Sequence, residues 1–158
     1  MNERARLLDD SPSNHDARNL AHLNIATFGF KQDDPRLAGF FDNLKRINQI
    51  AESSDGFVWR AQDEASLTSS EIRENEVANI SVWRNIESLA NFTYRSAHAE
   101  MLARRHGWFQ ASKHPRFVLW WISERHRPTL NEGVRKLRLL SAKGPSPAAF
   151  TFACDFPS

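Results

Sequence analysis

The segment 117–122 (FVLWWI) constrains the fold more than any other part of the sequence. Its β-branched and aromatic side chains predict a strand, and successive side chains of a strand point to opposite faces. Leu119 and Trp121 would lie on one face, Val118 and Trp120 on the other. Because both faces are apolar, this strand belongs in a sheet that is covered on both sides.

Three further segments predict strands: 22–30 (HLNIATFGF), 57–62 (FVWRAQ) and 77–83 (VANISVW). A helix is predicted after the first of them, with Asp34 as its N-cap and Pro35 in its first turn. One face of this helix is apolar, and the turn at Asp55 and Gly56 ends it. The residues of that apolar face are Leu37, Phe40, Phe41, Leu44, Ile47 and Ala51.

A second helix is predicted from about residue 85 or 86 to Arg105, before the strand 117–122. The order β-α-β-β-α-β is that of a ferredoxin-like α+β domain, in which both helices cover one face of a four-stranded antiparallel sheet. A capping box, Thr129 to Glu132, opens a third helix that ends near Gly144. The segment 150–152 is a candidate extra edge strand.

The predicted domain spans residues 20–158 and pairs with a second copy. Residues 1–19 are polar with few periodic apolar positions, so we expect a flexible N-terminal extension there. The segment 63–76 is equally polar and predicts a loop. Two helices cover only one face of the sheet, and a second copy is the simplest cover for the other. The sequence therefore predicts a homodimer through the sheet face, a dimeric α+β barrel.

The composition excludes several classes of function. The chain has 158 residues, of which 41% are hydrophobic, as expected for one soluble domain. With 21 basic and 19 acidic residues, its charge gives little support for a nucleic-acid partner. No segment approaches the roughly 20 apolar residues that cross a membrane. Cys154 is the single cysteine and has no partner for an internal disulfide, so we expect a cytoplasmic protein.

Several sequence blocks resemble a known family. They are HLNIATF, FFDNLKRIN, GFVWRAQDE, SVWRNIESLANFTYRSAH, RHGWF and LWWIS with HRPT. Together they are similar to the domain-of-unknown-function 3291 family, within the dimeric α+β barrel superfamily that includes antibiotic-biosynthesis monooxygenase-like proteins, haem-degrading proteins and chlorite-dismutase-like proteins. The resemblance implies the fold, and it implies no single activity because members of the superfamily differ in their chemistry.

The predicted second helix carries the main candidate catalytic residues. Tyr94, His98 and Arg105 are separated by four and seven residues, which places them in one stripe of a continuous helix. A phenol, an imidazole and a guanidinium in line could move a proton and stabilise an anion. The alternative is structural, with an exposed tyrosine, a satisfied helix histidine and an arginine that complements the helix C-terminus.

Candidate substrate-binding residues surround this stripe. Trp83 ends the preceding strand, and Trp108 with Phe109 follows the helix, so the three predict an aromatic-walled pocket. Asn24 and Arg46 are further candidates, although each is equally explained as a structural or solvated group. Trp59 and Trp120 are typical of a core or a dimer contact. The histidines form no zinc-binding pattern, and no nucleotide-binding or hydrolase motif is found.

Three hypotheses of function remain open at this stage. The first is an enzyme without a dissociable cofactor that performs monooxygenase-, isomerase- or cyclase-like chemistry on an aromatic or polyketide-like molecule. The second is a haem-binding protein with His98 as axial ligand, a role that the resemblance to haem-degrading proteins implies. The third is a non-catalytic ligand-binding dimer whose aromatic residues are structural.

Overall fold

The computed structural model describes residues 17–63 and 70–158 and confirms the ferredoxin-like α+β architecture. Four antiparallel strands form one sheet in the order β2-β3-β1-β4, with β1 and β3 in its centre. The strands are β1 (Arg18–Thr27), β2 (Phe57–Arg60), β3 (Glu76–Trp83) and β4 (Phe117–Ser123). The predicted extension, apart from residues 17–19, lies outside the described residues.

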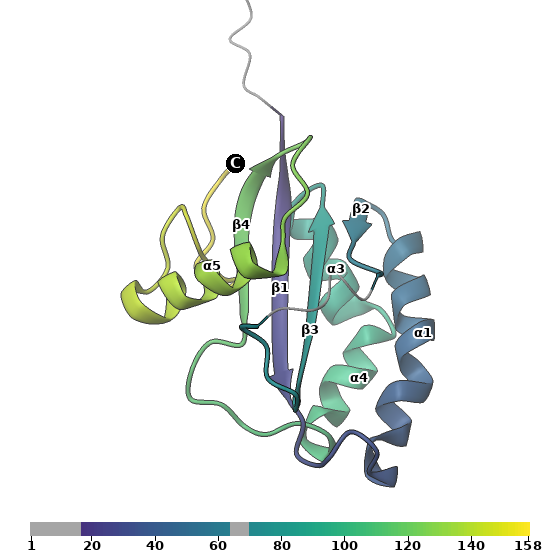
Figure 1. Cartoon of the computed structure of the whole chain (residues 1–158). Coiled ribbons are helices and arrows are strands. Elements are labelled where there is room, and N and C mark those ends of the chain that lie inside the picture. The colour runs from purple at the N-terminus through teal and green to yellow at the C-terminus, as the bar shows by residue number, and fades with distance from the viewer. Residues whose placement is uncertain (1–16, 64–69) are drawn as a thin grey trace, which may run out of the picture.

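Helices cover both faces of this sheet. One face, with Leu20, Trp83 and Leu119, is covered by α1, α3 and α4, which we call the helix layer (Figure 1). The other face, with Leu23 and Trp120, is covered by α5. Figure 1 shows α5 in front of the sheet and α3 and α4 behind it. The helices are α1 (Ala38–Ser53) after the 3-10 turn η1 (Pro35–Leu37), α3 (Ile86–Arg95), α4 (His98–Arg104) with the 3-10 turn η2 (Arg105–Gly107), and α5 (Leu130–Lys143).

The first strand is longer at its start than the sequence predicts. It begins at Arg18 instead of His22, because Leu20 is paired with Trp83 of β3 on one side and with Trp121 of β4 on the other. Pairing with neighbouring strands keeps this polar start of β1 extended, although its polarity alone suggests a loop. Arg18 and Asn19, which the sequence places in the extension, are therefore part of β1.

The prediction of one continuous second helix is wrong. The helix ends at Arg95, and Ser96 has extended backbone angles (φ −102°, ψ −177°) before α4 begins at His98. The Ser96 hydroxyl donates a hydrogen bond to the carbonyl of Phe92 and accepts one from the N–H of His98 at 3.1 Å. Ser96 thus satisfies backbone groups on both sides of the break, which the apolar periodicity does not reveal.

Helix α5 covers much of the sheet face for which the sequence predicts a second copy as cover. Gly133 permits this close approach, since a Cβ there would lie 2.9 Å from Cδ2 of Leu23. Towards β2 the cover is thinner, and Val58, Trp59 and Ala78 remain half-buried. A homodimer therefore stays a prediction.

The predicted helix signals are confirmed. Asp34 accepts from the N–H of Arg36 at 2.9 Å, although the turn it caps is η1 and not the α-helix itself. Thr129 accepts from the N–H of Glu132 at the start of α5. The predicted edge strand is reduced to a single antiparallel bridge between Leu119 and Phe150.

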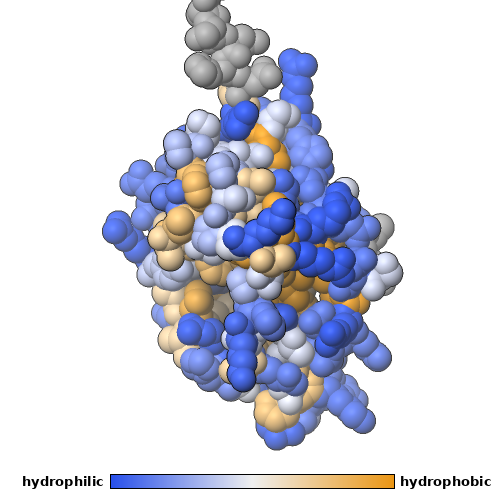
Figure 2. All heavy atoms as spheres, turned by 90° about the vertical axis from the view of Figure 1, so that its left-hand side faces the viewer, coloured by the Kyte–Doolittle hydropathy of each residue, from blue (hydrophilic) through white to orange (hydrophobic). Residues whose placement is uncertain are grey.

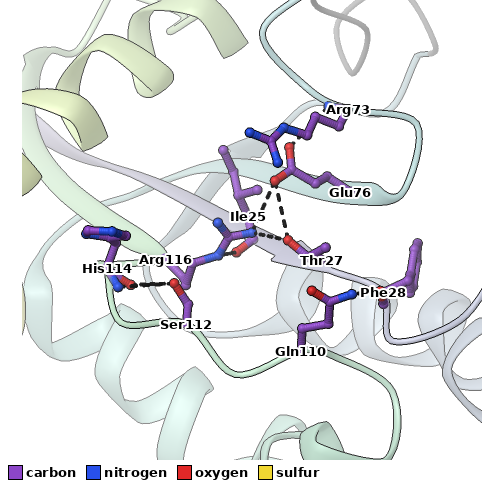
Figure 3. A network of polar contacts seen from close by, with 9 residues as sticks. All are labelled: Ile25, Thr27, Phe28, Arg73, Glu76, Gln110, Ser112, His114 and Arg116. Atoms are coloured by element: carbon purple, nitrogen blue, oxygen red, sulfur yellow. Dashed lines mark hydrogen bonds and ion pairs between the residues drawn. The ribbon is translucent and has the colours of Figure 1, made fainter.

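A polar network holds the far end of the central strands (Figure 3). Arg116 donates to the carbonyl of Ile25 at 3.1 Å and to the hydroxyl of Thr27 at 2.8 Å, and it pairs with Glu76 at 3.5 Å. Gln110 donates to the carbonyl of Phe28 from the same loop. These contacts fix the long loop before β4 to the ends of β1 and β3, which indicates a structural role.

Candidate functional site

The two central strands form a ladder of side chains under the helix layer. Leu20 is paired with Trp83, then His22 with Ser81, then Asn24 with Asn79. Leu20 and Trp83 are buried, and both asparagines are exposed. Between them, Ser81 is buried and His22 is half-buried. Side chains in the middle of a four-stranded sheet are exposed only where the helices do not cover them. The helix layer is therefore open above Asn24 and Asn79, next to His22.

A chain of hydrogen-bonding groups leads from the buried end of this ladder to His22. Trp83 donates its indole N–H to Ser81 Oγ at 3.0 Å, and Ser81 Oγ lies 3.3 Å from His22 Nδ1. Ser81 is 6% exposed and Trp83 1%. Buried polar groups need partners inside the protein, so this arrangement fixes the orientation of all three side chains.

His98 approaches the ladder from the helix layer. Its Nδ1 lies 3.2 Å from the carbonyl oxygen of Thr93, near the break between α3 and α4. A carbonyl oxygen only accepts, so Nδ1 carries the proton. In the neutral ring, Nε2 of His98 is then unprotonated and available as a base or a metal ligand.

Both histidines are neutral at physiological pH. Burial lowers the pKa of His22 from 6.5 to about 3, and the nearby His98 lowers it further. Burial also lowers the pKa of His98, against the opposing effect of its hydrogen bond to Thr93. Two imidazoles from different layers thus lie close together without charge, which is a combination found at functional sites more often than on ordinary surfaces.

Aromatic rings form the walls around the histidines. Phe92 of α3 stacks on Trp83 with centroids 5.1 Å apart, and its centroid lies 4.9 Å from the imidazole of His98. Phe117 of β4 lies 6.3 Å from His22. We call His22, Ser81, Trp83, Phe92 and His98 the histidine site.

A second group of rings extends from the histidine site towards solvent. Phe152 of the C-terminal segment contacts Phe117 and Tyr94, each with centroids 5.5 Å apart. Tyr94 is 56% exposed at the outer end of this group. The rings give a flat molecule an apolar surface beside the exposed asparagines.

The second ring nitrogen of each histidine has no hydrogen-bond partner among the described residues. Within residues 17–63 and 70–158, every fully buried side-chain nitrogen or oxygen has a hydrogen-bond partner. The hydrogen bonds of His22 and His98 use Nδ1 only. Nε2 of each ring is therefore not fully buried.

The predicted site residues divide into two groups. His98, Trp83, Asn24 and Tyr94 lie in or beside the histidine site, as described above. Arg105 is separated from it by its own helix end, where it is exposed and donates to the carbonyl of Leu102 at 3.1 Å. The predicted stripe of Tyr94, His98 and Arg105 is thus broken with its helix.

The other predicted residues belong to different surroundings. Trp108 packs with Phe28 and Phe40 in a separate apolar cluster, with Phe109 against it. Arg46 is exposed on α1. Their predicted roles in substrate binding stay predictions.

Sequence reasoning missed His22, Ser81 and Phe92. The alternation of a strand was the signal for the first, since His22 and Asn24 share a face in a segment that is otherwise apolar. Ser81 and Phe92 carry no such signal. Only the pairing of β1 with β3 and the packing of α3 bring them to His22 and His98.

A hollow of about 640 Å³ lies elsewhere, between η1 and α4. Its charged and ionisable residues, Arg36, Arg104 and His106, are exposed. Arg36 is paired with Asp34 at 2.7 Å, and Arg104 lies over the ring of Trp108. We place the functional site at the histidines instead, because their polar groups are positioned by burial and hydrogen bonds.

Two negative findings apply to the described part of the chain. No three histidine, cysteine, aspartate or glutamate side chains there are grouped so that they could hold a metal ion. None of its helices is both long and apolar enough to cross a membrane.

Solved structures resemble this chain at low sequence identity. SnoaB, a cofactor-independent oxygenase from Streptomyces nogalater, is 16% identical with a TM-score of 0.47, over 72% of this chain and 98% of SnoaB. MupZ from Pseudomonas fluorescens is 12% identical with a TM-score of 0.43, over 90% of each chain. A protein of unknown function from Nitrosomonas europaea is 10% identical with a TM-score of 0.47, over 72% of this chain and 95% of its own. These likenesses concern the fold alone.

The family assignment comes from the sequence. Comparison with curated proteins gives no match. The model of the family described as domain of unknown function DUF3291 matches residues 19–158, which includes every strand and helix described above except the first residue of β1. The chain therefore belongs to the DUF3291 family.

Proposed function

We propose that this protein is an enzyme that acts on a small aromatic or polyketide-like molecule without a dissociable cofactor, with His98 as its general base. The observation that carries the proposal is the pair of neutral imidazoles, His22 and His98, between a sheet and a helix layer with aromatic walls. A general base must be unprotonated and have a free nitrogen that reaches the substrate. Nε2 of His98 meets both conditions.

The first step of the proposed reaction is a proton transfer. The C–H bond beside a substrate carbonyl breaks, its proton forms an N–H bond at His98 Nε2, and the electron pair moves to the carbonyl oxygen. The products are an imidazolium and an enolate, so atoms and charge balance. Side-chain amides of Asn24 and Asn79 lie at the opening and supply N–H donors for the oxygen.

The lowered pKa of His98 restricts the substrate class. A base that is weakened by burial removes protons efficiently only from groups whose own acidity is raised. Ketones activated by an aromatic ring, 1,3-dicarbonyl compounds and phenols have this acidity, and polyketide-like molecules contain all three. The flat rings of Phe92, Phe117 and Phe152 suit such planar molecules.

The same enolate intermediate leads to each of the three proposed reaction types. It gives an isomerase if the proton returns to a different carbon, a cyclase if the enolate carbon attacks a second carbonyl group, and an oxygenase if it reacts with dioxygen as the oxidant. In each case Tyr94 stands at the entrance, where it contacts substrate. Arg105 has no part in the step, because it is exposed and directed to its own helix end.

Proton exchange tests the proposal without knowledge of the natural substrate. The probe is 2-tetralone, an aromatic ketone with an activated C–H group, and exchange of that hydrogen in D2O is followed by NMR. We expect saturable catalysis that falls about 100-fold or more in His98→Ala. His106→Ala is the control, since His106 is exposed on η2. Exchange that is equal in wild type and His98→Ala would refute the assignment of His98.

Haem binding is the second candidate, because one observation favours it. The hydrogen bond from His98 Nδ1 to a carbonyl is the contact that orients many metal-binding histidines, with Nε2 left for the metal. Titration with haemin tests this candidate. A sharp Soret band at one equivalent that is lost in His98→Ala and kept in His106→Ala would favour haem over the enzyme.

A homodimer also remains part of the proposal, through the half-buried strip Val58, Trp59 and Ala78 near the β2 edge. On the side of α5 and the C-terminal segment, polar side chains break the apolar surface into separate areas (Figure 2). Sedimentation velocity tests the pairing, with a dimer expected for the wild type and a monomer for Trp59→Arg.

A reducing, cytoplasmic location is in line with the exposed free thiol of Cys154.

A further inference from the structure

We infer that His22 is a permanent hydrogen-bond donor in the histidine site, held in its Nε2–H form by Trp83 and Ser81, and that it binds the substrate oxygen on which negative charge develops. This inference rests on the proposed function, in which His98 supplies the base. It assigns opposite roles to the two imidazoles, one as donor and one as acceptor.

The direction of the hydrogen bonds follows from what each atom can do. The indole N–H of Trp83 only donates, so Ser81 Oγ accepts it. The hydroxyl proton of Ser81 then needs an acceptor, because the side chain is buried. Nδ1 of His22 lies 3.3 Å from Ser81 Oγ and can accept this proton.

This direction fixes the tautomer of His22. If Nδ1 accepts from Ser81, the single proton of the neutral ring is on Nε2. In the opposite tautomer, Ser81 Oγ would accept from both Trp83 and His22, and its own buried hydroxyl proton would be left without an acceptor. Nε2, which is not fully buried, is therefore an N–H donor.

The charge state supports a donor role. Because burial and His98 lower the pKa of His22 to about 3, the ring does not become a cation at any pH at which the protein would ordinarily work. A neutral imidazole N–H can stabilise a developing oxyanion in the way that other uncharged donors do. His98 has the reverse arrangement, with its proton on Nδ1 and its lone pair on Nε2.

The two rings together define the group that they would recognise. Such a substrate has an acceptor oxygen for His22 and an acidic hydrogen for His98 within the same small unit. A ketone with an activated neighbouring C–H group has this pattern, and so does its enol. 2-Naphthol presents an enol-like oxygen on a flat aromatic frame, and naphthalene presents the frame alone.

The first test measures the tautomer directly in the protein without ligand. In ¹⁵N-labelled protein near pH 7, we expect the His22 shifts of an Nε2–H imidazole and the His98 shifts of an Nδ1–H imidazole. Ser81→Ala should remove the preference at His22, and Ser81→Thr should keep it. His22 found as the Nδ1–H form in wild type, or unaltered by Ser81→Ala, would overturn the inference.

The second test uses a pair of variants that separate the two ring nitrogens. The side-chain amide of His22→Gln can place an N–H near the position of Nε2, whereas His22→Asn reaches only the position of Nδ1. We expect His22→Gln to bind 2-naphthol within about threefold of wild type and His22→Asn to bind it at least tenfold more weakly. Naphthalene should bind all three proteins equally.

These outcomes separate the inference from the proposed function. If the tautomers and 2-naphthol binding are as expected but 2-tetralone exchange is not catalysed, the enzyme proposal fails and the donor role of His22 stands. If exchange depends on His98 but His22→Asn binds 2-naphthol as well as wild type does, the donor role fails alone. No detectable binding of 2-naphthol to the wild type would also overturn the inference.

Discussion

Trp120 of β4 donates its indole N–H to Glu132 of α5 at 3.0 Å, which joins the sheet to the first turn of the helix that covers it. The other carboxylate oxygen of Glu132 lies 2.7 Å from Nε2 of His126. The carboxylate thus connects β4, the following turn and α5. This connection matters because α5 covers the sheet face that two helices of a ferredoxin-like domain leave open.

Replacement of Glu132 by alanine should destabilise the domain by about 1 to 3 kcal/mol, since it leaves the indole N–H of Trp120 without its partner. Urea unfolding followed by tryptophan fluorescence measures the change. Glu124→Ala is the control, because Glu124 is exposed after β4. Equal stability of the two variants would show that the carboxylate does not hold α5.

The contribution of Glu132 should depend on pH in the acidic range. Burial raises the pKa of this carboxyl, but hydrogen bonds from His126 and Trp120 outweigh burial and hold the pKa below its ordinary value of 4.5. The folded protein therefore favours the ionised form, and the resulting stabilisation is complete above pH 4.5 and is lost as the pH falls below it. The difference in unfolding free energy between wild type and Glu132→Gln should shrink across that interval. A difference that is constant from pH 6 to pH 3 would contradict this account.

His22 should make the protein less stable as the pH falls from 6.5 towards 3. The unfolded chain binds a proton at His22 below its ordinary pKa of 6.5, whereas the folded chain does not until about pH 3. One such group contributes up to about 1.4 kcal/mol per pH unit. His22→Gln should reduce this slope in urea unfolding measured from pH 7 to pH 4, with the remainder coming from His98, whose pKa is also lowered by burial, and His106→Gln should retain the full slope. The same slope in both variants would mean that His22 titrates normally.

Gly56 should tolerate alanine less well than Gly144, although both have positive φ angles of 76° and 75°. A Cβ at Gly56 would overlap the side chain of Ser88, whereas one at Gly144 meets nothing within 4 Å. Both variants bear the backbone cost, and only Gly56→Ala adds an overlap of about 1 to 3 kcal/mol. Thermal unfolding compares them, and equal melting temperatures would show that Ser88 moves aside without cost.

The sequence predicted the histidine site only in part. His98 and Tyr94 were selected by their spacing along the predicted second helix, Trp83 by its place at the end of a strand, and Asn24 by its place on the first strand. Arg105 was grouped with them on the assumption of a continuous helix, and the hydroxyl of Ser96 removes that continuity. A serine in an amphipathic segment has the same pattern whether its hydroxyl faces water or ends a helix, so the break could not be predicted.

The sequence by itself determined the order of strands and helices, the caps at Asp34 and Thr129, and the need for cover on both faces of β4. These features depend on local backbone preferences and on alternation, which neighbouring residues decide. Only the tertiary structure decided that α5 supplies much of the second cover and that His22, Ser81 and His98 meet. Their meeting depends on the pairing of β1 with β3 and on the packing of α3 and α4, and such contacts join residues far apart in the chain.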